Sequence, residues 1–421
     1  MSEGPLSYAN DPRTPCKYGA KCYQKNPEHH RSYKHPPIDD LKKFNKNKRG
    51  KARNSPYARN KNTFTKGTEV SASTTHASSS DGKKPEDDIS VTTTTDQKKE
   101  DTYKDLPLVT LTENSQLYDK SEDNKLYSEL FLVEMPPDFF QFYKCLSEEK
   151  SVEKTLANVN LQLIGPYDLL LGKLPILDDK ELYLVHWRFF FDPPEFQAVL
   201  KKKGKSEFHI GYYRDDPESK PVFVASNDSG KDCLIQPLAD NIFAAVYNYL
   251  QNEKKTSPFL SLPCQKLMDK IKKWASENNY SLDEYDRKKR LPVTKTLHGA
   301  GIVVPFNKKT ELGYRPLVES NAKLRKMFTE LEACSSQKEK DEVLSQLQPV
   351  ITYATIAVDE CDFGTGLEIG IDLFCSGLKE LQSNAASSLS TVYSLLKRDA
   401  FAKIIKVHLK HRRKGPNMSV F

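Results

Sequence analysis

The sequence predicts an α+β protein, with a mixed helical and antiparallel-sheet body that follows a small zinc finger and a disordered linker. Aromatic and β-branched runs at 208–215 and 222–225 flank a Pro-containing turn, which is typical of a strand pair. Amphipathic segments of helical length follow at 242–252 and 261–278. Cys and His cluster in the first forty residues, where apolar side chains are few. These patterns predict a folded body and a separate metal-stabilised segment.

Length and composition limit the classes of protein to consider. A chain of 421 residues allows two or three domains, and its formal charge of +7 suits a polyanionic partner. Eight Cys do not make a disulfide scaffold in a chain of this length, and no apolar signal core follows Met1. No apolar run approaches the ~20 residues that span a bilayer. We therefore expect a soluble, intracellular protein with no membrane partner.

Four residues near the N-terminus have the spacing of metal ligands. Cys16, Cys22, His29 and His35 form a C-x5-C-x6-H-x5-H pattern in a segment too polar to bury a core. Such a set predicts a structural, tetrahedral Zn²⁺ site. The spacing differs from that of DNA-reading Cys2His2 fingers. His30 is an alternative third ligand, and the competing interpretation is a disordered tail with chance Cys and His.

The segment after the finger changes in composition. The basic run 42–53 indicates a nuclear import signal or a nucleic-acid tether, or else only a solvated charge run. Ser and Thr dominate 71–80 and 92–95, where hydrophobicity is too low to offset the entropy cost of ordering. We therefore place the finger at 10–38 and a flexible linker at 39–120.

The body is expected to divide into a helical or mixed part at 121–285 and a sheet-containing part at 286–415. In the first part, Asp138 is a plausible N-cap and His186 and His209 fit core or rim histidines better than metal ligands. Besides the elements above, this part is expected to hold helices at 138–146 and 151–161, a turn at 165–168 and a strand at 183–191.

In the second part, apolar and β-branched residues predict further elements. The basic run 287–290 should be an exposed loop, and His298-Gly299-Ala300-Gly301 a bulge or close backbone approach. Strands are expected at 293–306, 350–358 (where a helix is possible) and 367–373, and helices at 322–333, 337–347, 383–395 and 400–409, with Pro349 ending the second of these helices.

The acidic stretch from Asp359 to Asp362 lies between two of the expected strands and is followed by a Gly-x-Gly turn. Asp359, Glu360 and Asp362 would then share a loop at one sheet edge. Carboxylates beside buried surface lose hydration, which raises their pKa and makes them candidate general bases. The alternative is a polar loop whose acids only cap backbone amides. Tyr314-Arg315, on a turn, is either an interface anchor or an ordinary surface turn.

The N-terminal motif resembles the poly(ADP-ribose)-binding zinc fingers. The similarity covers residues 16–29 and the pair His35-Pro36. It implies that Tyr18 and Tyr23 stack on adenine and that basic neighbours such as Lys25 meet phosphates, as stacking and charge chemistry allow. Gln24 stands where that family usually has Arg.

The body resembles the histone PARylation factor 1 family over about 120–410. The motifs that carry the resemblance are Gly165-Pro166-Tyr167-Asp168, Phe191-Asp192-Pro193-Pro194-Glu195-Phe196, the segment 298–305, Gly313-Tyr314-Arg315, the segment 359–375 and Leu395-Leu396-Lys397-Arg398.

This resemblance implies a cofactor of a poly(ADP-ribose) polymerase rather than a complete enzyme. The partner's catalytic domain binds NAD⁺, and this chain supplies Glu360 as base with Asp359 shaping the site. Tyr314, Arg315 and Asp362 fall at the interface. The implied activity is ADP-ribosylation of serine on histones and other chromatin proteins, in the nucleus at damaged DNA. A non-catalytic poly(ADP-ribose) reader and a free-standing ADP-ribose hydrolase are the alternatives.

Overall fold

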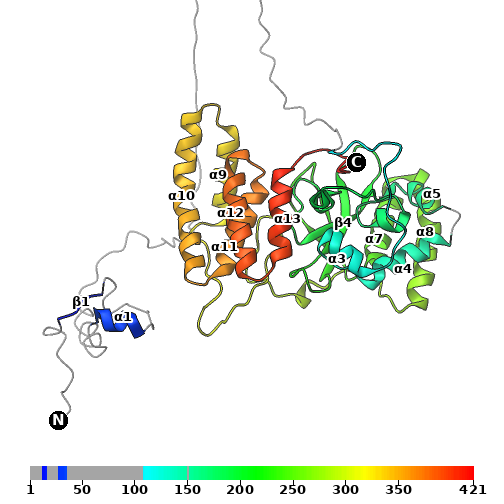
Figure 1. Ribbon diagram of the computed structural model, residues 1–421. Coiled ribbons are helices and arrows are strands. Elements are labelled where there is room, and N and C mark those ends of the chain that lie inside the picture. Colours follow the sequence, from blue (N-terminus) through cyan, green and yellow to red (C-terminus); the bar gives the residue numbers. More distant parts are fainter. Residues whose placement is uncertain (1–11, 17–26, 36–107, 149–150) are drawn as a thin grey trace, which may run out of the picture. The chain divides into compact units, whose positions relative to one another are not determined.

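The computed structural model describes residues 12–16, 27–35, 108–148 and 151–421 (Figure 1). The chain divides into two compact units, 1–95 and 96–421. Most of the predicted linker at 39–120 lies outside the described residues. Among those that are described, no helix combines the length and apolar composition that a membrane span requires.

In the first unit, the described residues form two short strands and one helix. β1 (Thr14–Pro15) pairs in parallel with β2 (Tyr33–Lys34), which directly follows α1 (Pro27–Ser32). The backbone N–H of Cys16 donates to the Lys34 carbonyl at 3.0 Å. This pairing brings two of the predicted metal-ligating segments together.

The second unit contains a five-stranded antiparallel sheet, which confirms the predicted α+β class. The strands follow one another in space as they do in sequence: β3 (Leu161–Leu163), β4 (Phe196–Lys202), β5 (Phe208–Tyr213), β6 (Phe223–Asp228) and β7 (Gln236–Ala239). The predicted pair at 208–225 is the β5–β6 hairpin. The expectation of a sheet in the C-terminal part is wrong, because this sheet lies within 161–239.

Helices of different lengths precede and follow the strands of this sheet. They are α3 (Asn124–Phe131), α4 (Pro137–Ser147), α5 (Val152–Ala157), α6 (Tyr167–Leu171), the 3₁₀ helices η2 (Lys180–Val185) and η3 (Pro258–Leu260), α7 (Ile242–Thr256) and α8 (Ser261–Glu277). α7 and α8 confirm the helices predicted at 242–252 and 261–278. The turn expected at 165–168 runs directly into α6.

Asp138 does not cap α4, because Pro136 holds the N-cap position. The Asp138 side chain is buried instead, and its Oδ2 accepts the Tyr212 hydroxyl at 3.0 Å and the Ile242 N–H at 2.8 Å. Burial raises the pKa of this carboxyl, against the lowering effect of those hydrogen bonds. Asp138 therefore joins α4 to the sheet and to α7.

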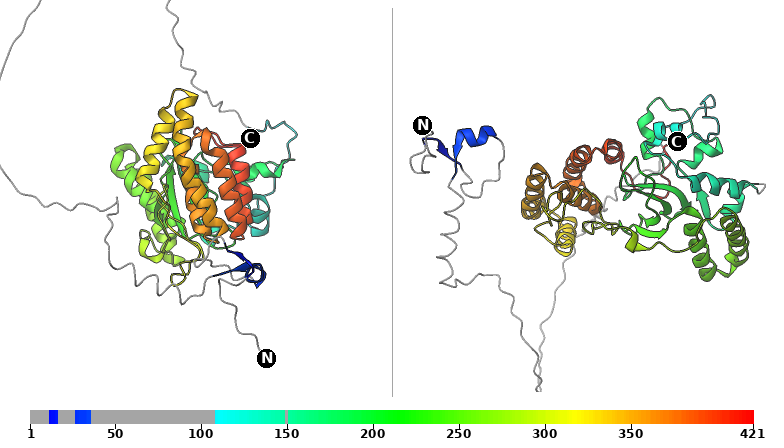
Figure 2. Two further views of the ribbon diagram at one scale, coloured as in Figure 1. Left: turned by 90° about the vertical axis from the view of Figure 1, so that its left-hand side faces the viewer. Right: turned by 90° about the horizontal axis from the view of Figure 1, so that it is seen from below.

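The C-terminal part consists mainly of helices that lie beside one another (Figures 1 and 2). After the short 3₁₀ helix η4 (Arg287–Lys289) these are α9 (Asn321–Ala333), α10 (Gln337–Asp359), α11 (Phe363–Ser376), α12 (Lys379–Leu395) and α13 (Asp399–Lys410). Four of them confirm the helices predicted at 322–333, 337–347, 383–395 and 400–409, although α10 continues well beyond the predicted end.

Two expected strands are therefore helical. The β-branched run 350–358 is the second half of α10, and Pro349 lies inside that helix rather than ending it. The alternating segment 367–373 belongs to α11, in which every residue from Gly364 to Cys375 is buried. A helix buried on all sides has no polar face, so its sequence loses the 3.6-residue period that would identify it.

Two further expected strands are wrong. The aromatic segment 183–191 forms the end of η2 and a buried loop, in which Trp187 has a left-handed φ of 57°. The segment 293–306 contributes one antiparallel residue pair, Thr294 with Ile302. Both segments contribute buried residues, such as Phe189 and Ile302, but aromatic and β-branched content did not determine their backbone conformation. Gly301 confirms a close backbone approach, since a Cβ there would lie 2.6 Å from the Thr294 carbonyl oxygen.

The two histidines of the first part are core residues, as predicted. His186 Nε2 lies 2.8 Å from Asp168 Oδ2, and His209 Nε2 lies 2.8 Å from Asp192 Oδ1. Both imidazoles are buried, and each is fixed by one carboxylate.

The basic run 287–290 is not wholly an exposed loop. Arg290 is buried, and its Nη2 pairs with Asp215 Oδ1 at 2.5 Å.

Candidate functional site

The predicted acids lie in the connection between α10 and α11. Glu360 ends α10, and the next two residues close its C-terminus with two backbone hydrogen bonds, Cys361 N–H to Val358 O at 2.9 Å and Asp362 N–H to Ala357 O at 2.8 Å. This is the Schellman arrangement. Its left-handed position usually holds Gly, but Cys361 occupies it here with φ 70°. The connection therefore turns sharply.

The turn gives the three acids different environments. Asp359 and Glu360 are exposed, as is Cys361, whereas Asp362 is buried. The expected sheet edge is wrong, since the acids connect two helices. On Glu360, 36% of the side chain remains exposed.

The segment that carries Tyr314 and Arg315 packs directly against this connection. Asp362 Oδ1 accepts the Gly313 N–H at 2.8 Å, and the Gly364 N–H donates to the Gly313 carbonyl at 2.8 Å. Gly364 permits this approach, since a Cβ there would lie 2.9 Å from the Gly313 oxygen. The predicted Gly-x-Gly turn is therefore the first turn of α11, and its role is close packing.

Thr365 fixes the backbone of Arg315 from the other side. Its hydroxyl accepts the Arg315 N–H at 3.0 Å and donates to the Arg315 carbonyl at 2.7 Å. Thr365 is completely buried. No local sequence pattern indicates this role, because the two residues lie 50 positions apart in the chain and Thr365 is part of a helix.

The Arg315 guanidinium joins the two predicted functional groups. Its Nη2 lies 2.5 Å from Glu360 Oε2, and its Nε lies 3.2 Å from Asp362 Oδ2. The second contact is a charge contact rather than a directed hydrogen bond. The guanidinium also lies 5.3 Å from the centre of the Tyr353 ring, within the range of a cation–π interaction. Arg315, Glu360 and Asp362 thus form one cluster at the protein surface.

Tyr314 points inward to a buried carboxylate. Its hydroxyl lies 3.2 Å from Glu368 Oε2, and the Thr294 hydroxyl donates to Glu368 Oε1 at 2.8 Å. Burial raises the pKa of Glu368, against the effect of these two hydrogen bonds, and burial also raises the pKa of Tyr314 to about 12. The expected strand at 367–373 includes Glu368, so the sequence does not predict its contact with Tyr314.

An apolar groove of about 580 Å³ borders this cluster. The side chains of Leu312, Leu395 and Cys361, all on its lining, are substantially exposed. Exposed apolar surface next to charged side chains is typical of protein interfaces. Its other lining residues are Pro305, Phe306, Asn307, Gly313, Phe363, Leu396 and Lys397.

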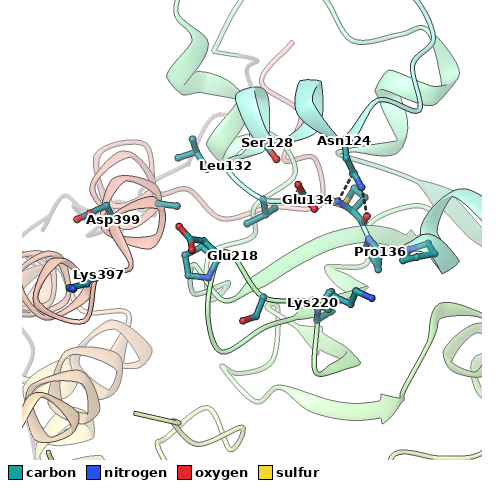
Figure 3. A pocket seen from close by; sticks show the side chains of 16 residues that line it. Asn124, Ser128, Leu132, Glu134, Pro136, Glu218, Lys220, Lys397 and Asp399 are labelled. Carbon is teal, nitrogen blue, oxygen red and sulfur yellow. Dashed lines mark hydrogen bonds between the residues drawn. The ribbon is translucent and has the colours of Figure 1, made fainter. Parts of the chain in front are cut away.

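Lys397 also borders a second hollow, of about 510 Å³ (Figure 3). Glu218 and Lys220, from the turn between β5 and β6, line it together with Asp399 at the start of α13. On another wall, the Asn124 side chain hydrogen-bonds both backbone groups of Met135. The hollow lies outside the predicted acid cluster, and its lining combines prolines with charges of both signs.

In the first unit, three of the four predicted metal ligands come together. Cys16 Sγ lies 3.5 Å from His29 Nε2, which lies 3.2 Å from His35 Nε2. All three donor atoms lie within 4.8 Å of one another. Tetrahedral zinc bonds of ~2.0–2.3 Å place their ligands at such separations, so the donor set fits Zn²⁺. Cys22 and the side chain of the alternative ligand His30 lie outside what the structure describes.

The residues predicted to bind poly(ADP-ribose), Tyr18, Tyr23 and Lys25, are also outside the described residues. The same holds for Gln24.

Comparisons with known proteins agree with the division into two units. A family model described as "Histone PARylation factor 1" matches residues 122–412, and one described as "PBZ domain" matches residues 13–38. The chain is 38% identical over 293 residues to histone PARylation factor 1 of Bos taurus, covering 67% of this chain and 84% of that protein. The Mus musculus protein of the same name is 38% identical over 304 residues (69% and 87%), and that of Danio rerio 37% over 292 (67% and 84%).

Proposed function

The chain belongs to the histone PARylation factor 1 family, and from this premise we propose that it completes the active site of a poly(ADP-ribose) polymerase and directs ADP-ribose to serine. In this proposal the partner's catalytic domain binds NAD⁺. Glu360 is the general base, and the acceptors are serines of histones and other chromatin proteins.

The exposed position of Glu360 is the observation that carries this proposal. A general base must lie within hydrogen-bond reach of the proton that it removes, in a site that excludes water. Glu360 projects instead from a sharp surface turn, beside the apolar groove. Such a carboxylate is half of an active site, and a partner that covers the groove would supply the other half.

The ion pair between Arg315 and Glu360 gives docking a further consequence. In the free chain, Arg315 Nη2 forms an ion pair with Glu360 Oε2 at 2.5 Å. A carboxylate or carbonyl oxygen of the polymerase that draws the guanidinium away would release Glu360 toward the serine. Tyr314 and Asp362 act at the interface by holding the segment that presents Arg315.

The chemistry requires such a base. A serine hydroxyl attacks C1″ of the nicotinamide ribose poorly unless its proton is removed as the new C–O bond forms and the bond to nicotinamide breaks. A positioned base typically contributes ~10²–10⁴-fold in rate. Asp359 adds a second negative charge next to Glu360, which would attract a Lys beside the acceptor serine.

The finger completes the proposal. Its match to the PBZ domain and the fit of its ligands to zinc support binding of poly(ADP-ribose) through Tyr18, Tyr23 and Lys25. A chain that holds existing polymer is concentrated where the polymerase is active. We therefore place the protein in the nucleus, on chromosomes at sites of DNA damage.

The test incubates the protein with a DNA-activated poly(ADP-ribose) polymerase, NAD⁺ and a histone-tail peptide, and maps acceptors by mass spectrometry. Wild type should yield serine modification, and Glu360→Gln should lose ~10²-fold or more of it while keeping polymerase binding in a pull-down. Arg315→Ala should lose the complex. Serine modification that persists with Glu360→Gln would overturn the assignment of the base.

A second candidate function is a non-catalytic poly(ADP-ribose) reader, with the body as a scaffold. The PBZ match favours it independently of the body. It predicts that Cys22→Ala abolishes polymer binding and that the chain leaves the acceptors on Glu and Asp unchanged. The same mass-spectrometric map distinguishes the two functions.

A further inference from the structure

Two cysteines of the body that lie far apart in the sequence belong to separate elements outside the acid cluster. Cys233 lies in the connection between β6 and β7, and Cys375 is the penultimate residue of α11. Each of these residues is 6% exposed, so both lie just beneath the surface.

Leu297 joins the surroundings of the two cysteines. The Cys233 thiol donates to the Leu297 carbonyl, with Sγ 3.7 Å from the oxygen, and the Leu297 N–H donates to Asp372 Oδ1 at 2.8 Å. Asp372 and Cys375 are three residues apart on α11, so their side chains lie on the same face of this helix. Leu297 therefore contacts Cys233 on one side and the face of α11 that carries Cys375 on the other.

The two sulfur atoms interact directly and differ in their tendency to ionise. A hydrogen bond from the Cys375 thiol lowers the pKa of Cys233 against the effect of burial, and the charge of Arg325 lowers it further. Arg325 is fixed nearby, since its Nη2 donates to the Leu297 carbonyl at 2.8 Å. Burial raises the pKa of Cys375 well above its usual value, and the hydrogen bond to Cys233 adds to this effect. One thiol of the pair therefore ionises readily, while the other keeps its proton.

Two other cysteines show what burial does to a thiol without this arrangement. Cys145 and Cys264 are completely buried. Burial raises the pKa of Cys145 to about 12, and it also raises the pKa of Cys264. Because the thiolate is the nucleophilic form of cysteine, such thiols react slowly with oxidants. Cys264 therefore provides a matched control for the pair.

A readily ionised cysteine beside a second thiol can form a disulfide through a sulfenic acid. The Cys233 thiolate attacks one oxygen of hydrogen peroxide, the O–O bond breaks, and hydroxide leaves. The Cys375 sulfur then attacks the sulfur of the sulfenic acid, so that an S–S bond forms and the S–O bond breaks. The departing hydroxyl group takes the Cys375 proton, and the hydroxide takes the proton that Cys233 released. Two thiols are thus oxidised to one disulfide, and the peroxide is reduced to two water molecules.

We propose that Cys233 and Cys375 form a reversible disulfide, in which Cys233 reacts first with hydrogen peroxide. The bond joins α11, which begins directly after the acids, to a connection of the sheet. In a reducing compartment a disulfide of this kind is transient and typical of redox sensing. This inference does not depend on the function proposed for the acid cluster.

The test treats the full-length protein with hydrogen peroxide, blocks the remaining thiols with iodoacetamide, and maps proteolytic peptides by mass spectrometry without reduction. In the wild type, the peptides that carry Cys233 and Cys375 should be linked and lighter by two hydrogen atoms than the two thiol peptides together. Dithiothreitol should restore both thiols. The variant Cys264→Ser should form the same link as the wild type.

Two single variants test which sulfur reacts first. In Cys375→Ser, Cys233 should stop at the sulfenic acid, which dimedone labels. In Cys233→Ser, Cys375 should be oxidised at least ~10-fold more slowly, because a smaller fraction of this thiol is ionised. Circular dichroism confirms that each variant is folded. The wild-type map requires no substitution, so it tests the disulfide even if a variant unfolds.

Three outcomes would overturn the proposal. The first is a map in which Cys233 and Cys375 remain thiols while the exposed Cys361 is oxidised. The second is a link between the two peptides that forms only in urea, because it would belong to the unfolded chain. The third is oxidation of Cys375 in one single variant that is as fast as that of Cys233 in the other, which would remove the role assigned to Cys233.

Discussion

Replacing Thr365 with Val tests whether a buried hydroxyl positions Arg315. The substitution keeps the branched shape of a completely buried side chain and removes only its hydroxyl group. It leaves the Arg315 N–H and carbonyl, now bonded at 3.0 and 2.7 Å, without that partner. Each buried group that loses its partner costs about 1–3 kcal/mol, and water reaches these groups in part, so we expect a loss of about 2–4 kcal/mol in the free energy of unfolding.

Urea denaturation followed by circular dichroism measures this loss. Thr355→Val is the matched control, because the Thr355 hydroxyl donates to the Ile351 carbonyl on an exposed face of α10, and we expect a change within about 0.5 kcal/mol. If Thr365→Val also stays within about 0.5 kcal/mol of wild type, the two hydrogen bonds do not matter for stability. If it is destabilised but binds the polymerase with unchanged affinity, Thr365 does not position Arg315.

Three other changes test separate features. Gly364→Ala places a Cβ 2.9 Å from the Gly313 carbonyl oxygen and should cost about 1–3 kcal/mol in urea unfolding, whereas wild-type stability would show that this approach is not tight. Burial raises the pKa of Asp372 well above 3.8, so its contribution to stability is full below pH 3.8 and is lost as pH rises through the folded-state pKa. In Asp372→Asn, the free energy of unfolding should therefore lose the pH dependence that one titrating group contributes, which is up to about 1.4 kcal/mol per pH unit. An unchanged pH dependence would contradict the raised pKa of Asp372. A chelator should remove one zinc per chain and the finger's amide NMR signals while the body's signals persist, and purified protein without zinc would refute a site at Cys16.

The sequence predicted the features that depend on neighbours in the chain. The spacing of Cys16, His29 and His35 indicated a metal site, because ligands in a short segment have little freedom to lie apart. The helices α7 and α8 each keep an exposed face, so their periodicity is visible in the sequence. The strands of the hairpin at 208–225 are buried on both faces, and aromatic and β-branched content around a Pro-containing turn predicted them. The sequence also predicted Asp359, Glu360 and Asp362 as site residues, through their resemblance to a family motif.

Tertiary structure alone decided how those acids are presented. α11 is buried along its length, and burial on every side removes the periodic contrast that distinguishes a helix from a strand. The sequence therefore predicted a sheet edge where a Schellman turn exposes Glu360. The contacts of Arg315 with Glu360 and Thr365 join residues 45 and 50 positions apart, and no local pattern encodes such pairs. Packing of two distant segments brought these residues together and formed the surface on which the proposed function depends.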